Sequence, residues 1–330
     1  ETENLVIIGL ITDQPGPYKV ELSLSTDFFN SSPVEMVSGA LVTIEDDLGN
    51  ASVLEESSPG VYWTKKSEIT GQVGRKYQLT VKLVDGRIFQ SSPEELLDNS
   101  GMSSIYTELK TKTVRNEFGV LVPQNGLEVF VDSNPSVSDQ SFYRWRWTGT
   151  YEILTSPQQV TIADPETGIQ IPNPPPCAGI VDGVEVFECG CCTCWVEEYS
   201  QTVLLGDSKL AQEGQKNVFM NFIEIDEWRF YVKYHTYVEQ MSLTQSGYEF
   251  WKSVEDQQQQ GTIFDPTLGA ITSNITAINN EDEVLGYFGA SSIKSISNFT
   301  LRSEVPIFIG EIGTYTESCL TYDENSTNVK

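Results

Sequence analysis

Short segments in which apolar and polar residues alternate recur along this chain, and they constrain its fold more than any other feature. In residues 18–25, for example, Tyr18, Val20, Leu22 and Leu24 fall on one face of an extended segment. Alternation with a period of two is typical of a β-strand with one buried face. The chain is also rich in strand-forming aromatic residues, with 14 Tyr and 15 Phe, while long helical patterns are nearly absent. We therefore expect an all-β protein.

The first hundred residues contain roughly seven such segments spaced about ten residues apart, which is typical of a Greek-key sandwich. A hairpin turn is predicted at Asp85-Gly86, and Tyr77 occupies the position of a tyrosine-corner residue. Through residues 39–40, 47–50, 60–62 and 74–81 this part resembles the carboxypeptidase-regulatory-like and similar immunoglobulin-like modules. The resemblance implies an immunoglobulin-like sandwich over residues 1–97.

A polar, glycine-containing stretch at residues 93–104 predicts a boundary between two domains. Residues 98–330 are again rich in strand patterns, the longest at 228–244, and we expect a larger β-rich domain there, either a sandwich or a barrel. Gly286 and Gly289 flank Tyr287-Phe288, where the backbone is expected to pass close to a neighbour.

One segment of this second domain has a helical pattern. Ser242 and Gln245 form an S-x-x-Q capping box, and aromatic residues then recur three or four positions apart until Gly261. We expect one short helix that packs on the sheet and buttresses it.

The segment 140–152 places two arginines on one face of a strand and three aromatic residues on the other. The candidate binding residues are Arg144, Trp145, Arg146 and Trp147. In an acidic protein, the arginines are expected to pair with carboxylates of a neighbouring strand. The alternative is a binding platform for sugars or for an anionic ligand.

Five of the six cysteines lie within one proline-rich loop. The six are Cys177, Cys189, Cys191, Cys192, Cys194 and Cys319. An even number of cysteines in an exported chain favours three disulfides, although six cysteines allow 15 pairings and the sequence does not select one. The alternative is a thiolate site for zinc or copper(I), but zinc sites favour C-x₂₋₄-C pairs in two separate arms, and exported thiolates oxidise. We expect disulfides and no metal.

The formal net charge of −27 disfavours nucleic acid as a partner, and it disfavours docking to anionic lipid through a basic surface. His235 is the one histidine, and the sequence has no G-x-S-x-G motif. A Ser-His-Asp triad or a histidine-rich metal site is therefore not expected. Asp46, Asp47 and Asn50 are interpreted as turn residues, because their spacing does not match a calcium-binding EF-hand loop. We predict that the protein is not an enzyme and has no cofactor.

The chain opens directly on polar residues followed by a strand, and its longest apolar runs are too short to span a bilayer. It is interpreted as the mature part of an exported protein.

Several stretches together resemble a family of exported Bacteroidota lipoproteins known only as a domain of unknown function. They are LITDQPGPYKVELS, GALVTIEDDLGN, the cysteine cluster ending in CW, LTQSGYEFWKSV, GTIFDP, SNI and EVLGYFGASS. The resemblance implies an outer-membrane protein that faces the cell exterior, with a lipid-bearing cysteine just upstream of Glu1. It also implies a TonB-dependent receptor as partner, and no catalytic residue can be transferred from it.

We therefore expect a non-enzymatic, surface-exposed lipoprotein that captures substrate for a TonB-dependent transporter or caps it. The alternative function is that of a structural or adhesive cell-surface module for glycan or protein.

Overall fold

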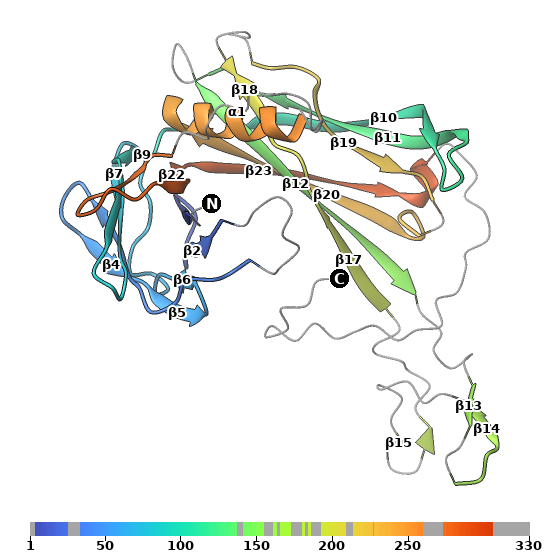
Figure 1. Ribbon diagram of the computed structural model, residues 1–330. Helices are drawn as coiled ribbons and strands as arrows, with labels where there is room; N and C mark the ends of the chain where they lie inside the picture. Colours follow the sequence, from blue (N-terminus) through green and yellow to red (C-terminus); the bar gives the residue numbers. More distant parts are fainter. Residues whose placement is uncertain are drawn as a thin grey trace.

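The computed structural model describes residues 4–25, 34–136, 141–154, 161–163, 166–172, 180–181, 184–185, 193–208, 214–226, 228–259 and 273–305 (Figure 1). Within these ranges strands predominate, and α1 (Gln245–Gln259) is the one α-helix. The expectation of an all-β protein with a single helix is therefore confirmed. The strands form two units, called here the first and second sandwich.

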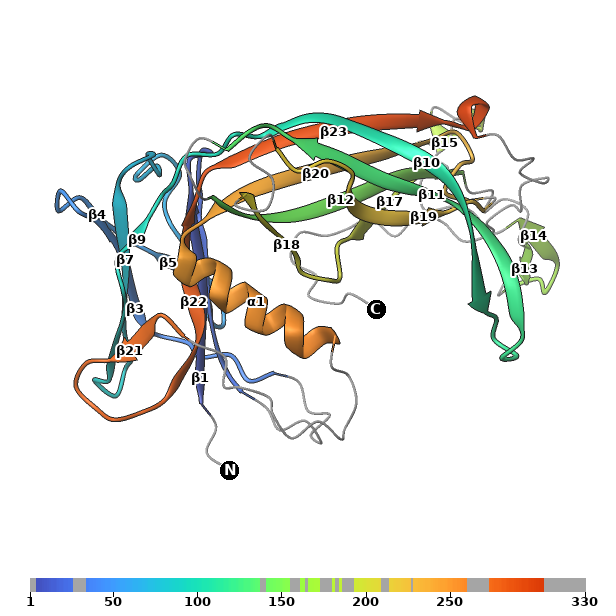
Figure 2. The ribbon, with the colours of Figure 1, turned by 90° about the horizontal axis from the view of Figure 1, so that it is seen from above.

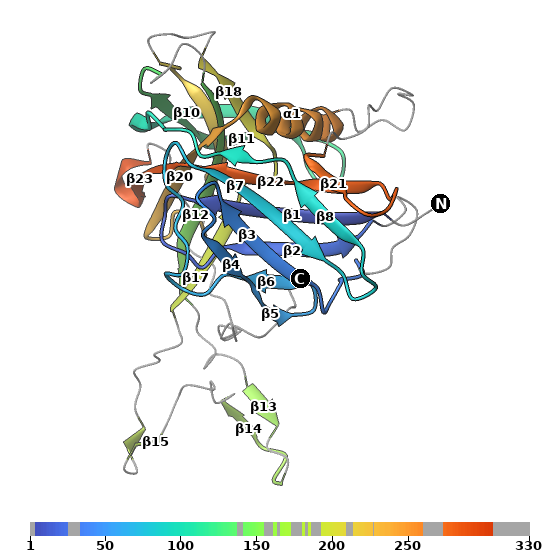
Figure 3. The same cartoon turned by 90° about the vertical axis from the view of Figure 1, so that its left-hand side faces the viewer.

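The first sandwich consists of two sheets that face each other (Figure 3). Across the first sheet the strands are β22 (Val284–Ser291), β1 (Leu5–Thr12), β2 (Lys19–Leu24), β6 (Val61–Trp63) and β5 (Glu55–Ser58). Across the second they are β21 (Ile275–Ala277), β8 (Ile88–Ser91), β7 (Lys76–Lys82), β3 (Leu41–Asp46) and β4 (Ala51–Val53), with β9 (Glu94–Glu95) paired to β7.

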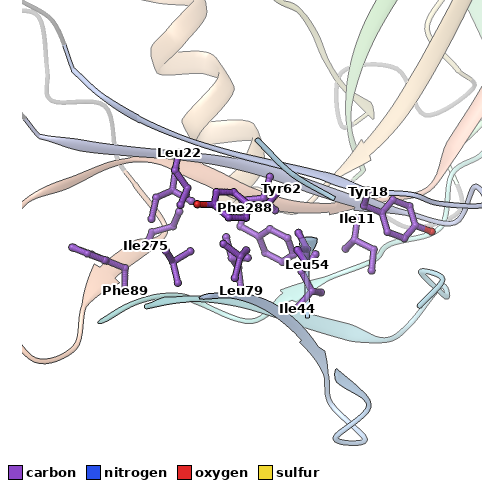
Figure 4. Packing of buried hydrophobic residues seen from close by; sticks show 14 of the residues in the cluster. Ile11, Tyr18, Leu22, Ile44, Leu54, Tyr62, Leu79, Phe89, Ile275 and Phe288 are labelled. Atoms are coloured by element: carbon purple, nitrogen blue, oxygen red, sulfur yellow. The ribbon is translucent and has the colours of Figure 1, made fainter. Parts of the chain in front are cut away.

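Alternate residues of these strands fill the core between the two sheets (Figure 4). Val20 and Leu22 of β2 are fully buried there, as the alternation predicts. Tyr77 is buried too, and its hydroxyl accepts a 2.8 Å hydrogen bond from the backbone N–H of Gln72. The predicted hairpin joins β7 to β8 through Asp85-Gly86, closed by a 2.9 Å bond from Leu83 N to Arg87 O.

Two strands of the first sandwich come from the far end of the chain. β22 pairs in parallel with β1 from Leu5↔Val284 to Thr12↔Ser291, and β21 pairs with β8. The predicted division into residues 1–97 and 98–330 is therefore wrong for residues 275–291. An alternating pattern predicts that a strand exists but not which distant strand it pairs with, so the sequence did not reveal this.

Gly286 makes the parallel pairing possible. Its φ of +103° favours glycine, and a Cβ there would lie 2.0 Å from the backbone oxygen of Ile7. The predicted close passage of the backbone is confirmed at this position.

The second sandwich packs a three-stranded sheet on a five-stranded one, with one shared hydrophobic core (Figure 2). The first is β10 (Met102–Arg115), β11 (Leu121–Ser133) and β19 (Val218–Glu224). The second is β17 (Thr193–Tyr199), β12 (Phe142–Leu154), β20 (Lys233–Leu243) and β23 (Ile293–Leu301), with β18 (Leu204–Asp207) paired to β12. The long strand predicted at 228–244 thus begins only at Lys233, and η3 (Arg302–Glu304) follows β23.

Two small hairpins lie between β12 and β17 in the chain. They are β13 (Thr161–Ala163) with β14 (Gln170–Pro172), and β15 (Ile180–Val181) with β16 (Val184–Glu185). Among the described residues, no helix is long and apolar enough to cross a membrane.

The stretch between the two sandwiches is tightly bonded rather than a loose linker. Asn99 is buried, and its side-chain amide donates to the backbone oxygens of Gln240 at 2.7 Å and Ser292 at 2.9 Å. Ser242 donates a 2.7 Å bond to the backbone oxygen of Leu97. These bonds fix the second sandwich against the first.

Ser242 is also where the predicted helix cap is wrong. Ser242 is the penultimate residue of β20, and its hydroxyl accepts a hydrogen bond from the backbone N–H of Ser292. The residue that caps α1 is Thr244, whose Oγ1 accepts a 3.1 Å bond from Gly247 N. Ser242 thus belongs to the strand, and the helix starts two residues later than the motif indicates.

Candidate functional site

Helix α1 lies in the angle between the two sandwiches (Figure 2). Residues of both sandwiches and of α1 line a cleft of about 490 Å³ there. One wall is the outer face of the first sheet, with Ile8 and Leu10 of β1. The opposite wall is the end of the second sandwich, and Trp251 of α1 lies between them. Its volume is within the range of pockets that bind drug-sized molecules.

The alternation of β12 decides which side chains reach this cleft. Tyr143 and Trp145 are buried in the core of the second sandwich. Arg144 and Arg146 therefore point to the other face of the strand, where both line the cleft. The predicted division of this strand into an aromatic and an arginine face is confirmed.

The two arginines differ in their neighbours across the sheet. Arg146 lies opposite Glu239 of β20 and forms an ion pair with it, as predicted. Arg144 lies opposite Met241 on one side and Leu205 on the other. For Arg144 the predicted carboxylate partner is wrong, because both adjacent strands place an apolar residue there.

Arg144 is held by an aromatic contact instead. Its guanidinium carbon lies 3.6 Å from the centroid of the Trp251 ring, a cation–π arrangement. Its Nε is buried without a hydrogen-bond partner, and no described carboxylate forms an ion pair with it. Burial, and then the positive charge of Arg146, lower the pKa of Arg144 to about 10, so the side chain keeps its charge at neutral pH.

A buried carboxylate lies at the start of α1, on the same cleft. Glu94 accepts hydrogen bonds from Thr244 Oγ1 at 2.6 Å, Ser246 Oγ at 3.0 Å and Asn274 Nδ2 at 3.2 Å. The Tyr287 hydroxyl lies 2.9 Å from Ser246 Oγ, and burial followed by the charge of Glu94 raises the Tyr287 pKa. The Glu94 carboxylate thus has three neutral hydrogen-bond donors, whereas Arg144 Nε has no hydrogen-bond partner.

The other candidate binding residues do not reach the cleft. Trp145 is buried in the core, and Trp147 lines a second, open pocket of about 600 Å³ on another side of the second sandwich. In that pocket Arg229 is paired with both Glu198 and Asp226, so its charge is met within the protein. Sequence reasoning missed Glu94 and the role of Trp251. Only the aromatic spacing of the helix pointed to the latter.

His235 lies on β20 and stacks on Phe299 with ring centroids 4.4 Å apart. In the turn at 46–50, Asp46 Oδ1 accepts bonds from Leu48 N and Asn50 N, both 2.9 Å, so these residues act as the predicted turn. Within the described ranges, no group of three or more His, Cys, Asp and Glu side chains could hold a metal ion.

Cys194 of β17 is the one cysteine within the described part of the chain, where no cysteine is free. Cys177, Cys189, Cys191, Cys192 and Cys319 lie outside the described residues. The three predicted disulfides therefore stay a prediction.

Comparison with protein families finds one model, Domain of unknown function (DUF4249), that matches residues 1–297. The chain belongs to this family. A comparison with curated proteins and one with solved structures found no match. The matched range contains both sandwiches up to β23, and with them every residue described above for the cleft of this DUF4249 protein.

Proposed function

We propose that this DUF4249 protein is a non-enzymatic, lipid-anchored protein of the bacterial outer membrane. It faces the cell exterior and captures a small molecule for a TonB-dependent transporter. The observation that carries the proposal is the cleft between the two sandwiches, which offers a drug-sized space and a cation without an anionic partner among the described residues. A binding protein needs such a preformed site, with a few polar groups among apolar walls.

The rigidity of the cleft also supports a capture role. Its walls belong to different sandwiches, and the bonds of Asn99 and Ser242 hold those sandwiches together. A preformed site loses less conformational entropy when it binds a ligand than a site that must first close.

The location and the partner rest on the resemblance to exported lipoproteins and on the cysteine content. An acidic surface, with a net charge of −27, suits solubility in an external medium and is compatible with a protein partner. The same proposal includes three further points. The protein comes from a member of the Bacteroidota, it carries a lipid anchor, and its first sandwich is immunoglobulin-like.

Affinity purification from detergent-solubilised outer membranes tests the proposed role. The full-length protein carries a C-terminal tag, and an unrelated tagged lipoprotein serves as the control. We expect a TonB-dependent transporter to co-purify with this protein and not with the control. Recovery of the protein alone, while TonB-dependent transporters stay intact in the same extract, would overturn the proposal.

A second candidate function, an adhesive surface module, is favoured by the hairpin of β10 and β11. No side chain in residues 109–123 is buried, and the exposed ones include two large apolar residues, Phe118 at 80% and Leu121 at 59% exposure. An isolated two-stranded ribbon is only marginally stable in water, and exposed apolar tips often contact partners. If this function holds, Phe118→Ser with Leu121→Ser reduces the binding of cells to surfaces coated with the protein.

A further inference from the structure

The unmet charge of Arg144 is set by the register of the sheet. Positions 144 and 146 share one face of β12, yet β20 presents Met241 to the first and Glu239 to the second. Next to Met241, β23 presents Ile293, which is apolar as well. The same sheet therefore neutralises one arginine and leaves its neighbour in an apolar surrounding.

Arg144 is half-buried, with its Nε fully buried. A cation withdrawn from water without a counter-charge destabilises a folded protein, and a guanidinium is almost always charged. The remaining charged side chains of the cleft do not neutralise Arg144, because each is bonded to another group. Lys19 is paired with Glu21 at 3.0 Å, Arg146 with Glu239, and Glu94 is bonded to hydroxyl and amide donors. In a chain with a net charge of −27, a cation kept free of carboxylates indicates a site for an external anion.

The geometry of Arg144 narrows the kind of anion. The Trp251 ring lies 3.6 Å from the guanidinium carbon and Nε is buried, which leaves the two terminal nitrogens, Nη1 and Nη2, as the N–H donors for a ligand. A guanidinium edge binds a carboxylate or a phosphate through two parallel hydrogen bonds. Around it, the walls at Ile8, Leu10, Met241 and Ile293 are apolar, and they suit a hydrocarbon body rather than a sugar or an inorganic ion.

We propose that the cleft binds an amphipathic organic anion, with its oxyanion head on the edge of Arg144 and its apolar body between β1 and β20. This inference rests on the proposed capture function and names its substrate class. Carboxylate and phosphate heads share the required chemistry, and the probes below distinguish them. Trp251 acts as a positioning residue, because it holds the guanidinium rather than touching the head of the ligand.

Calorimetric titration of the purified full-length protein tests the site directly. The probes are octanoate, octyl phosphate, the neutral octanamide, and acetate and inorganic phosphate as heads without a body. We expect octanoate or octyl phosphate to bind at least tenfold more tightly than octanamide and than either bare head. The tighter of the two identifies the head group. Octanamide binding as tightly as both octyl anions would overturn the proposal.

Variants assign the binding to Arg144. Arg144→Gln is expected to weaken anion binding by about 10- to 100-fold, because it removes a charge-assisted pair of hydrogen bonds. The matched control is Arg87→Gln, which removes an arginine paired with Asp85 and Asp282 away from the cleft. Equal binding by the two variants, both confirmed as folded by their melting curves, would contradict the assignment.

Met241→Glu supplies a second, independent test. It places opposite Arg144 the carboxylate that Glu239 offers to Arg146, so the protein itself would neutralise the site. Anion binding is expected to fall as far as in Arg144→Gln although the arginine is still present, and unchanged binding would count against the site. Because purified protein is used, a failure here leaves the co-purification with a transporter unaffected, so the two proposals can fail separately.

Discussion

The hydroxyl of Thr244 donates a 2.6 Å hydrogen bond to the carboxylate of Glu94, which lies 150 residues earlier in the chain. Glu94 belongs to the first sandwich through β9, whereas Thr244 follows β20 of the second and caps α1. One side chain thus serves both as a helix cap and as a bond between the two units. The placement of α1, and with it of Trp251 in the cleft, depends on this pair.

Replacement of Thr244 by valine should therefore lower stability more than the loss of an ordinary cap. It removes the cap of Gly247 N and leaves buried Glu94 with one donor fewer. We expect the free energy of unfolding to fall by about 2–3 kcal/mol in urea denaturation. Thr113→Val, at an exposed position of β10, is the control and should change it by less than about 0.5 kcal/mol. Similar effects of both would show that the contact contributes little.

Gly149 allows Tyr234 to cross β12. A Cβ at position 149 would lie 1.8 Å from the Tyr234 hydroxyl oxygen, and that hydroxyl donates a 2.8 Å bond to Glu198. Gly149→Ala should displace the ring, break this bond and lower the free energy of unfolding by about 3 kcal/mol.

The double variant Gly149→Ala with Tyr234→Phe tests this cause. Because phenylalanine lacks the oxygen nearest to the new methyl group, we expect the two losses of stability to sum to more than the loss in the double variant. Strict additivity would show that the alanine acts elsewhere.

Burial, and then the positive charge of Lys233, hold the pKa of His235 below its ordinary value of 6.5. Between the two pKa values the unfolded chain binds the proton and the folded chain does not. The contribution of neutral His235 to the free energy of unfolding is therefore complete above pH 6.5, and it declines as the pH falls through the folded-state pKa. Since His235 is the sole histidine, its ring protons give one NMR titration curve, and we expect a midpoint below 6.5.

Lys233→Gln isolates the smaller of the two causes. It removes the neighbouring charge, so the midpoint of His235 should move upward while staying below 6.5, because burial remains. A midpoint at or above 6.5 in the unaltered protein would contradict the burial of this ring on Phe299.

The first sandwich needs its late strands. A fragment of residues 1–97 lacks β22 and β21, which lie at an edge of each sheet, and it would expose Ile7 and Ile11 of the core. We expect this fragment to be unfolded or aggregated by the fluorescence of Trp63, its single tryptophan. Addition of a peptide of residues 273–292 should restore a blue-shifted spectrum, whereas a peptide of scrambled sequence should not. A fragment that folds cooperatively alone would contradict the role of these strands.

Local patterns in the sequence predicted much of what the structure contains. The alternation in β2 and in β12 identified the buried face of each strand, and it placed Arg144 and Arg146 together on the opposite face. Such patterns depend only on the geometry of one strand. They also predicted the turns at Asp46 and Asp85. In each turn the aspartate side chain accepts a hydrogen bond from the backbone N–H two residues later.

Long-range relationships were beyond the sequence. Nothing in β1 indicates that β22 is its parallel partner, and nothing in β20 indicates that Met241 rather than Glu239 lies opposite Arg144, because register follows from the whole sheet. The contact between Arg144 and Trp251 depends in turn on the position of α1. For that reason the cleft, which lies between two units, could not be predicted, although both of its arginines could be named.

Gln240 and Trp145 provide the last prediction. They lie opposite each other on β20 and β12, both are buried, and neither the Gln240 amide nor the Trp145 Nε1 has a hydrogen-bond partner within the described structure. A buried amide without partners is destabilising, so replacement by an apolar side chain of similar size should remove that penalty. We expect Gln240→Met to raise the free energy of unfolding by about 1–2 kcal/mol. Gln78→Met is the matched control, because its amide donates a 2.8 Å bond to Ser91 O and its replacement should lower stability. A loss of stability in both variants would indicate that water molecules satisfy Gln240 in solution.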